Sequence, residues 1–137
     1  MAEPPTDAPR RILVVEDSPI VSMDTEDMLR GHGYHVVGPA PNMGAAIELA
    51  QKEQIDAAVV DVNIRGGKAF PVLRLLSERG IPFLLTSGYA DWTMPDEWKD
   101  RPRLQKPYRA DLLAARLADL GDGRERPAGE GEAPAGS

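Results

Sequence analysis

Carboxylate side chains follow two of the apolar runs in this 137-residue sequence. Glu16 and Asp17 come directly after the run at residues 11–15, and Asp61 follows the run at residues 57–60. Three like charges that meet at one place repel one another, and at least one pKa rises unless a cation joins them. Mg²⁺ prefers oxygen ligands of this kind and keeps several of its own waters. The acids therefore predict a magnesium site, provided that the fold brings the two runs together.

Hydroxyl and ammonium groups end two further apolar runs. The run at residues 82–86 ends in Thr86 and is followed by Ser87, and Lys106 follows the short run at residues 103–105. Such a set could hold a phosphoryl group, because a cation and a lysine neutralise its oxygens while a carboxylate attacks the phosphorus. Taken one at a time, each residue has a simpler explanation: the acids cap helices or face solvent, the lysine is solvated, and the serine forms a turn. Their joint occurrence at four run ends favours the phosphoryl site.

The apolar runs alternate with helical patterns along the chain, which predicts βαβ units and a parallel sheet. Near-continuous apolar runs are typical of strands that helices cover on both faces. Ser18 and Asn42 are the expected N-caps of the first two helices, and Pro95 predicts that the fourth helix is short or irregular. The predicted strands are residues 11–15, 34–38, 57–60, 82–86 and 103–105.

These elements predict an α/β fold of the (βα)5 type, with a doubly wound parallel five-stranded sheet. In the flavodoxin-like order 2-1-3-4-5, the first and third strands are neighbours at the topological switch point. Sites of such sheets form beyond the carboxyl ends of the strands. The order therefore places Glu16, Asp17 and Asp61 in one pocket, with Lys106 facing them.

Composition excludes several classes of function. The formal net charge of −6 argues against a basic surface for nucleic acid. The absence of cysteine rules out disulfides and thiolate zinc sites, and no apolar run reaches the roughly 18 residues of a membrane span. We therefore expect a soluble, cytoplasmic protein with one domain at residues 10–120. Residues 1–9 and 121–137 are rich in proline, glycine or charge and are expected to be disordered.

The motifs around these residues resemble those of two-component response-regulator receiver domains. They are LVVEDS at 13–18, AVVDVNI at 58–64, LLTSGYA at 84–90 and QKPY at 105–108. The resemblance covers roughly residues 10–120, and the joint spacing is far more specific than any one motif. Residues 83–89 also match the strand-four motif of the FAT-GUY subgroup, to which the chain is most similar.

The resemblance implies a role for each residue singled out above. Asp61 matches the phosphoacceptor, and Glu16 and Asp17 match the acidic pair that holds Mg²⁺. Asn63 matches the position two beyond the acceptor, whose backbone carbonyl also ligates the metal. Lys106 matches the invariant lysine that pairs with the phosphate.

The switch hydroxyl of such domains matches Ser87, with Thr86 one step earlier as the alternative. Arg103 stands at the position where receivers of the common type carry an aromatic residue. The usual swing of an aromatic side chain toward the hydroxyl therefore cannot occur at this position. The resemblance then implies that Tyr89 takes its place or that the output runs through the loop at 88–101.

Two further features concern loops near the site. Arg65-Gly66-Gly67 replaces the Pro-Gly turn of many receivers and predicts a mobile loop. Trp92, Met94 and Trp98 either offer apolar anchors to a partner or pack in the core.

The resemblance implies a single-domain response regulator, which is a signalling protein rather than an enzyme. It would accept a phosphoryl group on Asp61 from a histidine kinase, of the HWE/HisKA2 type by analogy with the subgroup, or exchange it with a histidine phosphotransfer protein. We expect a monomer or weak dimer that binds neither nucleic acid nor membrane. A rival function is that of a phosphorylation-independent pseudo-receiver, which acts as an interaction module.

A cofactor binder and a phosphohydrolase have less support from the sequence. A flavodoxin-like cofactor binder needs a phosphate-binding loop after the first strand, where the acidic stretch EDSP repels phosphate. A phosphohydrolase of the dehalogenase type also uses an aspartate nucleophile, but it needs further carboxylates and a cap domain for which 137 residues are too few.

Overall fold

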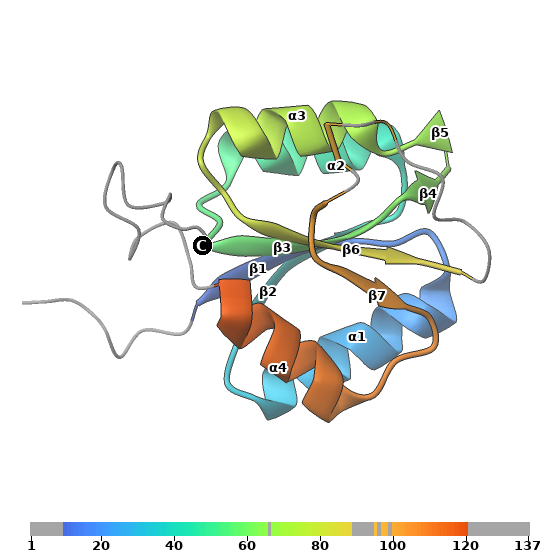
Figure 1. The fold of residues 1–137 in the computed structure, drawn as a ribbon, viewed down its shortest axis with the longest axis vertical. Coiled ribbons are helices and arrows are strands. Elements are labelled where there is room, and N and C mark those ends of the chain that lie inside the picture. Colours follow the sequence, from blue (N-terminus) through green and yellow to red (C-terminus); the bar gives the residue numbers. More distant parts are fainter. Residues whose placement is uncertain (1–9, 66, 89–94, 96, 99, 121–137) are drawn as a thin grey trace, which may run out of the picture.

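The computed structural model describes residues 10–65, 67–88, 95, 97–98 and 100–120. Five parallel strands form its central sheet in the spatial order β2-β1-β3-β6-β7 (Figure 1). These are the first to fifth strands of this sheet in chain order, so the predicted flavodoxin-like order 2-1-3-4-5 is confirmed. The strands are β1 (Arg11–Val15), β2 (His35–Ala40), β3 (Ala57–Asp61), β6 (Phe83–Ser87) and β7 (Arg103–Gln105).

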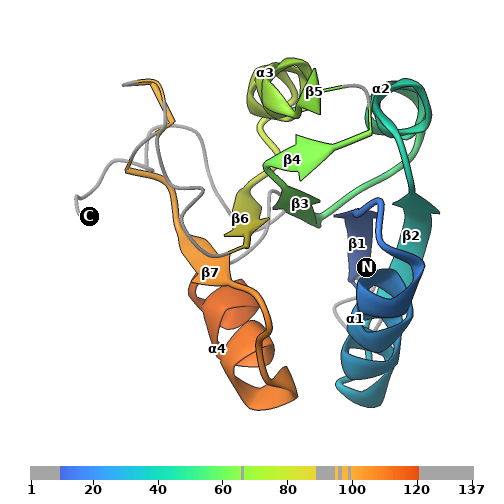
Figure 2. The same cartoon turned by 90° about the vertical axis from the view of Figure 1, so that its right-hand side faces the viewer.

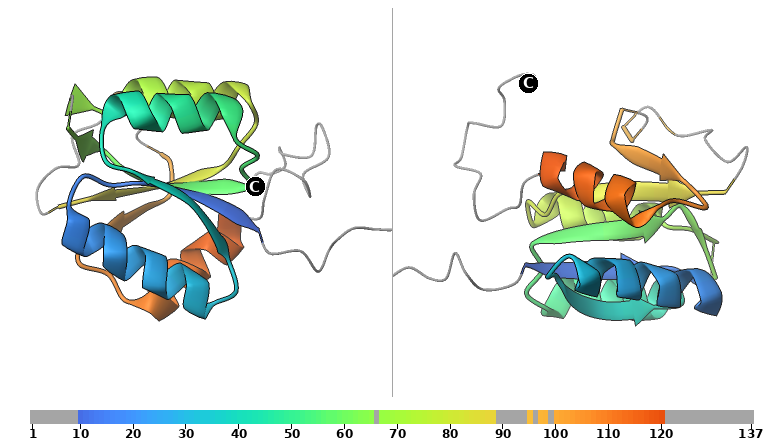
Figure 3. Two further views of the ribbon diagram at one scale, coloured as in Figure 1. Left: turned by 180° about the vertical axis from the view of Figure 1, so that it is seen from behind. Right: turned by 90° about the horizontal axis from the view of Figure 1, so that it is seen from below.

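Four helices cover the two faces of this sheet within the described residues. α1 (Pro19–Gly31) and α4 (Ala110–Leu120) lie on one face, and α2 (Met43–Lys52) and α3 (Phe70–Glu78) lie on the other (Figure 3). Right-handed crossovers between parallel strands produce such a two-sided cover. None of the helices in the described part of the chain has the length and apolar character to span a bilayer.

Side chains of β1 alternate between the two faces of the sheet and enter two separate cores. Leu13 and Val15 pack on the side of α2 and α3, whereas Ile12 and Val14 pack on the side of α1 and α4. All four side chains are buried. Full burial of each contributes roughly 1.5–3 kcal/mol, so the cores fix the strand and, with it, the position of the acids that follow.

The first two helices begin where the sequence predicted. Ser18 Oγ accepts a hydrogen bond from the backbone N–H of Val21 at 3.4 Å, and Pro19 occupies the first turn of α1. Asn42 Oδ1 accepts from the backbone N–H of Ala45 at 2.9 Å and caps α2. Both N-cap predictions are confirmed, and α1 therefore starts immediately beyond the acidic pair at the end of β1.

Strand β2 runs to Ala40, two residues beyond its predicted end at Gly38. Its pairing with β1 changes register between Leu13 and Val15, so that β2 holds one extra residue there. Gly38 has a φ of +98°, and a Cβ at this position would meet the backbone nitrogen of Ala40 at 2.9 Å. The glycine therefore permits a bulge inside the strand instead of ending it. The extension lets the Ala40 carbonyl accept from the backbone N–H of Glu16 at 3.0 Å.

A short hairpin follows β3, where the sequence predicted only a loop. β4 (Asn63–Ile64) and β5 (Gly67–Lys68) pair antiparallel beyond the end of β3 and next to α3 (Figure 2). Ile64 is buried in the core on the α2–α3 side and anchors the hairpin there. Two-residue strands carry no periodic signal, so the pattern of the sequence could not reveal them. Gly66 lies outside the described residues.

The connection between β6 and β7 is described only in part. Trp98 is 4% exposed and packs edge-to-face on Phe83, with ring centroids 5.9 Å apart. The interpretation of Trp98 as a partner-binding anchor is therefore wrong, because its indole belongs to the core. The predicted short fourth helix stays a prediction. Three residues with predicted roles lie outside the described residues: Tyr89, Trp92 and Met94.

Candidate functional site

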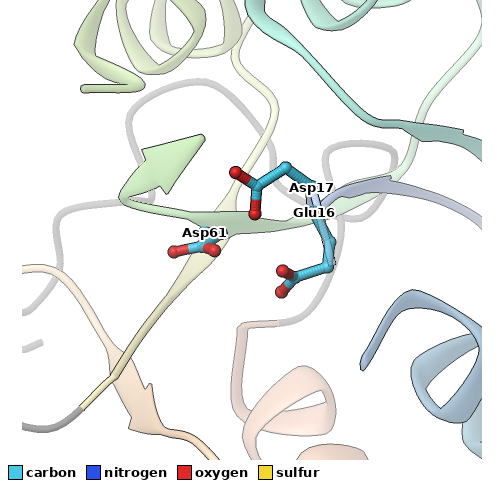
Figure 4. Close-up of side chains that lie close together, drawn as sticks. All are labelled: Glu16, Asp17 and Asp61. Carbon is cyan, nitrogen blue, oxygen red and sulfur yellow. The ribbon is translucent and has the colours of Figure 1, made fainter. Parts of the chain in front are cut away.

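The carboxyl ends of β1 and β3 bring the three predicted acids together. One carboxylate oxygen from each of Glu16, Asp17 and Asp61 lies within 4.8 Å of the other two (Figure 4). β1 and β3 are neighbours in register, with Val15 opposite Val60. The next residue on each strand is an acid, so the register itself places Glu16 and Asp61 at the same level of the sheet edge.

Asp61 is the last residue of β3 and is only 3% exposed. Its Oδ1 accepts a hydrogen bond from the backbone N–H of Asn63 at 3.1 Å. Its register partner on β6 is Thr86, whose carbonyl accepts from the backbone N–H of Val62 at 2.9 Å. The hydrogen bonds of the adjoining backbone therefore fix the direction of this carboxylate.

Lys106 reaches both buried acids from the end of β7. Its Nζ lies 3.0 Å from Asp61 Oδ2 and 3.2 Å from Glu16 Oε1. The backbone N–H of Lys106 donates to the Ser87 carbonyl at 2.8 Å, which ties the lysine to the end of β6. The structure thus brings together side chains from the ends of β1, β3 and β7, as the predicted strand order requires.

The Glu16 carboxylate accepts hydrogen bonds from Lys106 and from the start of α1. Its Oε2 accepts a hydrogen bond from the backbone N–H of Ser18 at 3.1 Å, and its carboxylate is buried. Ser18 also caps α1, so one residue both starts the helix and orients the acid. Asp17, between them, is half-buried and contributes the third carboxylate of the cluster.

Burial dominates the electrostatics of the two inner acids. It raises the pKa of Asp61 above its ordinary value, although the hydrogen bond and the charge of Lys106 lower it. Burial likewise raises the pKa of Glu16, against the lowering effect of the hydrogen bond from Ser18. For Lys106, burial lowers the pKa, but the hydrogen bonds and charges of Asp61 and Glu16 together outweigh burial and raise it. One lysine therefore compensates only in part for the crowded, desolvated acids.

The acid cluster has the composition of a magnesium site. Its three donors are carboxylate oxygens, and Mg²⁺ is a hard cation that prefers such ligands. Because two of the carboxylates are buried and only partly compensated, a bound divalent cation would relieve their desolvation and repulsion. The residues present therefore fit the ion that the sequence predicted.

Two buried hydroxyl side chains end β6. Successive side chains of a strand point to opposite faces, so Thr86 and Ser87 lie on different sides of β6. Thr86 is the register partner of Asp61, whereas the backbone carbonyl of Ser87 binds Lys106. Counting along the sequence favoured Ser87, and the register adds a reason to consider Thr86.

Lys68 is a neighbour of the site that was not predicted from the sequence. Its Nζ donates a hydrogen bond to the side-chain oxygen of Asn63, and the two residues are register partners in the β4–β5 hairpin. The hairpin alone brings them together, so no spacing rule in the sequence could have found the contact. Arg103, the predicted substitute for an aromatic residue, lies in β7 opposite Leu85.

Comparisons with known proteins agree with this geometry. The family model for the response regulator receiver domain matches residues 12–117. The transcriptional regulatory protein PdtaR of Mycobacterium tuberculosis is 32% identical over 141 residues, which cover 96% of this chain and 69% of PdtaR. The phyllosphere-induced regulator PhyR of Methylorubrum extorquens is 26% identical over 116 residues, which cover 80% of this chain and 42% of PhyR.

Solved structures show the same fold. The solution structure of SdrG from Sphingomonas melonis Fr1 is similar with a TM-score of 0.75 and 40% identity, over 84% of this chain and 98% of SdrG. The BeF3-activated conformation of SdrG gives a TM-score of 0.70 at the same identity and coverage. The family match spans every site residue described above. This chain therefore belongs to the response regulator receiver domain family, whose members are signalling modules of two-component systems.

Proposed function

We propose that this receiver domain accepts a phosphoryl group on Asp61 and signals through protein contacts. The observation that carries the proposal is the 3.0 Å ion pair between Lys106 Nζ and Asp61 Oδ2, inside a cluster of three acids. A buried carboxylate with a purely structural role needs one partner, whereas this one is crowded by two further acids. Crowding of this kind is typical of functional sites. Membership of the receiver family supports the same role.

Asp61 supplies the attacking atom in the proposed reaction. One carboxylate oxygen forms a bond to phosphorus while the phosphorus–nitrogen bond of a phosphohistidine donor breaks. The electron pair of the broken bond leaves with the imidazole, which is protonated by water. The hydrogen bond from the Asn63 N–H holds the carboxylate in one orientation. Lys106 Nζ, which contacts Asp61 Oδ2, is placed to pair with an oxygen of the new aspartyl-phosphate.

Three carboxylates and one carbonyl are the proposed ligands of Mg²⁺: Glu16, Asp17, Asp61 and the backbone carbonyl of Asn63. When bound, the ion would neutralise phosphoryl oxygens and lower their repulsion from the acids. Without a cation, the same acids repel an incoming phosphoryl group. We therefore expect phosphorylation to depend on Mg²⁺.

The new negative charge must bias an element that has two arrangements. Ser87, or Thr86 beside it, is the proposed hydroxyl that moves to bond the phosphoryl group. Because the Ser87 carbonyl binds the backbone N–H of Lys106, a shift at the end of β6 acts directly on the end of β7. Arg103 replaces the usual aromatic residue, so we propose that residues 88–101 transmit the conformational change to a partner.

The proposed donor is a histidine kinase or a histidine phosphotransfer protein, the partners of receiver domains in general. Assignment to the FAT-GUY subgroup, and hence to a kinase of the HWE/HisKA2 type, rests on the match of residues 83–89. SdrG, a relative at 40% identity, has a BeF3-activated conformation, which supports acceptor chemistry in this chain. The proposal extends to a folded unit at residues 10–120 that acts in the cytoplasm as a monomer or weak dimer.

Incubation with acetyl phosphate and Mg²⁺, followed by intact-protein mass spectrometry, tests the proposal. We expect one phosphoryl adduct on the wild type, no adduct on Asp61→Asn, and none on the wild type when EDTA replaces Mg²⁺. Asp111→Asn is the matched control, because Asp111 is an exposed aspartate on α4 away from the cluster, and it should be phosphorylated normally. A folded wild type that takes up no phosphate would contradict the proposal and support the pseudo-receiver function.

A further inference from the structure

A hydrogen bond links α1 to the segment that follows Lys106. Thr25 Oγ1 and the Tyr108 hydroxyl lie 2.7 Å apart, although the two residues are 83 positions apart in the sequence. Thr25 is buried, and the Tyr108 ring packs against the core on the α1–α4 side. A phenylalanine at position 108 would supply the same ring. The hydroxyl therefore adds a directional contact to packing that does not itself require one.

Tyr108 is separated from Lys106 only by Pro107, so the two anchors of this segment lie close together. At one end, the backbone N–H of Lys106 donates to the Ser87 carbonyl on β6 at 2.8 Å. At the other end, the Tyr108 hydroxyl bonds to Thr25 on α1. The Lys106 side chain extends from this short segment to the carboxylate of Asp61.

A pocket of about 270 Å³ lies beside the same segment. Its lining includes Val21 and Thr25 from α1, together with Lys106 and Tyr108. Well-packed interiors hold side chains in place by filling the surrounding volume, but open volume adjoins Lys106 on this side. Packing therefore does not fill the space on this side of Lys106, and the hydrogen bond to α1 opposes a shift of the segment into it.

We propose that the hydrogen bond between Thr25 and Tyr108 positions Lys106 by holding residues 106–108 against α1, so that the ammonium group stays on Asp61. Thr25 and Tyr108 are positioning residues, because neither touches the acceptor carboxylate. The inference rests on the proposed function, since the lysine is held ready for the phosphoryl group. α1 then has a second role besides covering the sheet, because Thr25 lies on it.

Phosphorylation rates with acetyl phosphate and Mg²⁺ give the first test. Tyr108→Phe and Thr25→Val each remove one partner of the hydrogen bond, and each should slow phosphorylation by about three- to tenfold. The double variant should be no slower than the slower single variant, because both substitutions break the same contact. Tyr34→Phe is the matched control, since Tyr34 packs against the same core and should react at the wild-type rate. Wild-type rates in both single variants, or additive effects in the double variant, would overturn the proposed positioning role of Thr25 and Tyr108.

The lysine signals in a ¹³C NMR spectrum give a second test that does not depend on phosphorylation. The chain has four lysines, so ¹³Cε labelling gives a spectrum in which Lys106 is assigned by its loss in Lys106→Ala. In Tyr108→Phe the Lys106 signal should move toward the position of exposed lysines, while in Tyr34→Phe it should stay. Urea unfolding of each variant establishes that it is folded.

The two tests separate this inference from the function on which it rests. A wild type that takes up no phosphate contradicts the proposed function, whatever the Lys106 signal does. A phosphorylated wild type whose Lys106 signal is unmoved in both Tyr108→Phe and Thr25→Val overturns the positioning role alone. A signal that moves in both variants supports that role.

Discussion

Asp61 stands in two opposing environments. Burial disfavours its charge and raises its pKa, while Lys106 at 3.0 Å favours the charge. The balance falls on the side of burial, because Glu16 shares the same lysine and Asp17 adds a third charge. The Asp61 carboxylate is therefore held at a cost in stability that a bound cation would offset.

Asp61→Asn should stabilise the metal-free protein at pH 7. The substitution removes the crowded charge and keeps the shape of the side chain, while Lys106 retains Glu16 as a partner. We expect a gain in the free energy of unfolding, because the raised pKa of Asp61 means that its negative charge destabilises the folded state. Urea unfolding of both proteins in the presence of EDTA measures it.

The sign of the pH dependence follows from the raised pKa of Asp61. A carboxyl whose folded-state pKa is raised gives its full stability below the ordinary value of about 3.9, and that stability is lost as the pH rises through the folded-state pKa. The difference in the free energy of unfolding between Asp61→Asn and the wild type should therefore become smaller as the pH falls. Asp111→Asn should give no gain, because Arg109 lowers the pKa of that exposed carboxyl. Equal stability of wild type and Asp61→Asn at pH 7 would contradict this account.

Mg²⁺ binding should weaken as the pH falls below neutral. Protons and the metal compete for the same carboxylates, and the raised pKa values of Glu16 and Asp61 let protons compete at a higher pH than for ordinary carboxyls, which titrate at about 3.9–4.3. Isothermal titration calorimetry at a series of pH values measures the apparent dissociation constant. An affinity that does not change until the pH reaches the ordinary carboxyl range would show that the inner acids are not the ligands.

At the scale of the elements, the junctions between strands and helices position the site. β1 ends at the acids and α1 begins at Ser18, whose backbone N–H orients Glu16 and whose hydroxyl caps the helix. Asn42, the N-cap of α2, forms a β-bridge with Arg65, the residue that follows β4. At Ser18, helix capping and site geometry therefore depend on the same residue.

Asn42→Ala should destabilise the domain by about 1 kcal/mol, the usual cost of losing an N-cap side chain. The substitution leaves the backbone N–H of Ala45 without the acceptor that now lies at 2.9 Å. Urea unfolding measures the loss, with Ser77→Ala as the control, because Ser77 is an exposed polar residue on another helix. A loss no larger than that of the control would show that the cap contributes nothing.

Local signals explain which elements the sequence could predict. Five apolar runs predict strands and two capping residues predict helix starts, each from a signal only a few residues long. These strands and helices lie where they were expected. The β4–β5 hairpin and the extension of β2 past Gly38 escaped prediction, because one needs a two-residue pairing and the other needs a bulge against β1. Both depend on partners that lie elsewhere in the chain.

In the complete fold, the strand order brings residues that are far apart in the sequence into one site. The order 2-1-3-4-5 is one of the common orders of doubly wound sheets, and it is enough to bring Glu16, Asp17 and Asp61 to one edge. The same reasoning could not find the bond between Thr25 and Tyr108, because it depends on how α1 sits against the segment after β7. Sheet topology is thus readable from the sequence, whereas contacts between helices and loops need the three-dimensional structure.

Chemical trapping identifies the residue that carries the phosphoryl group. Wild type is treated with acetyl phosphate and Mg²⁺, the aspartyl-phosphate is reduced with borohydride to homoserine, and the peptides are sequenced by tandem mass spectrometry. We expect homoserine at position 61 alone, and none when the treatment omits Mg²⁺. Homoserine at position 17, or a stable phosphate on Ser87 with position 61 unmodified, would contradict it.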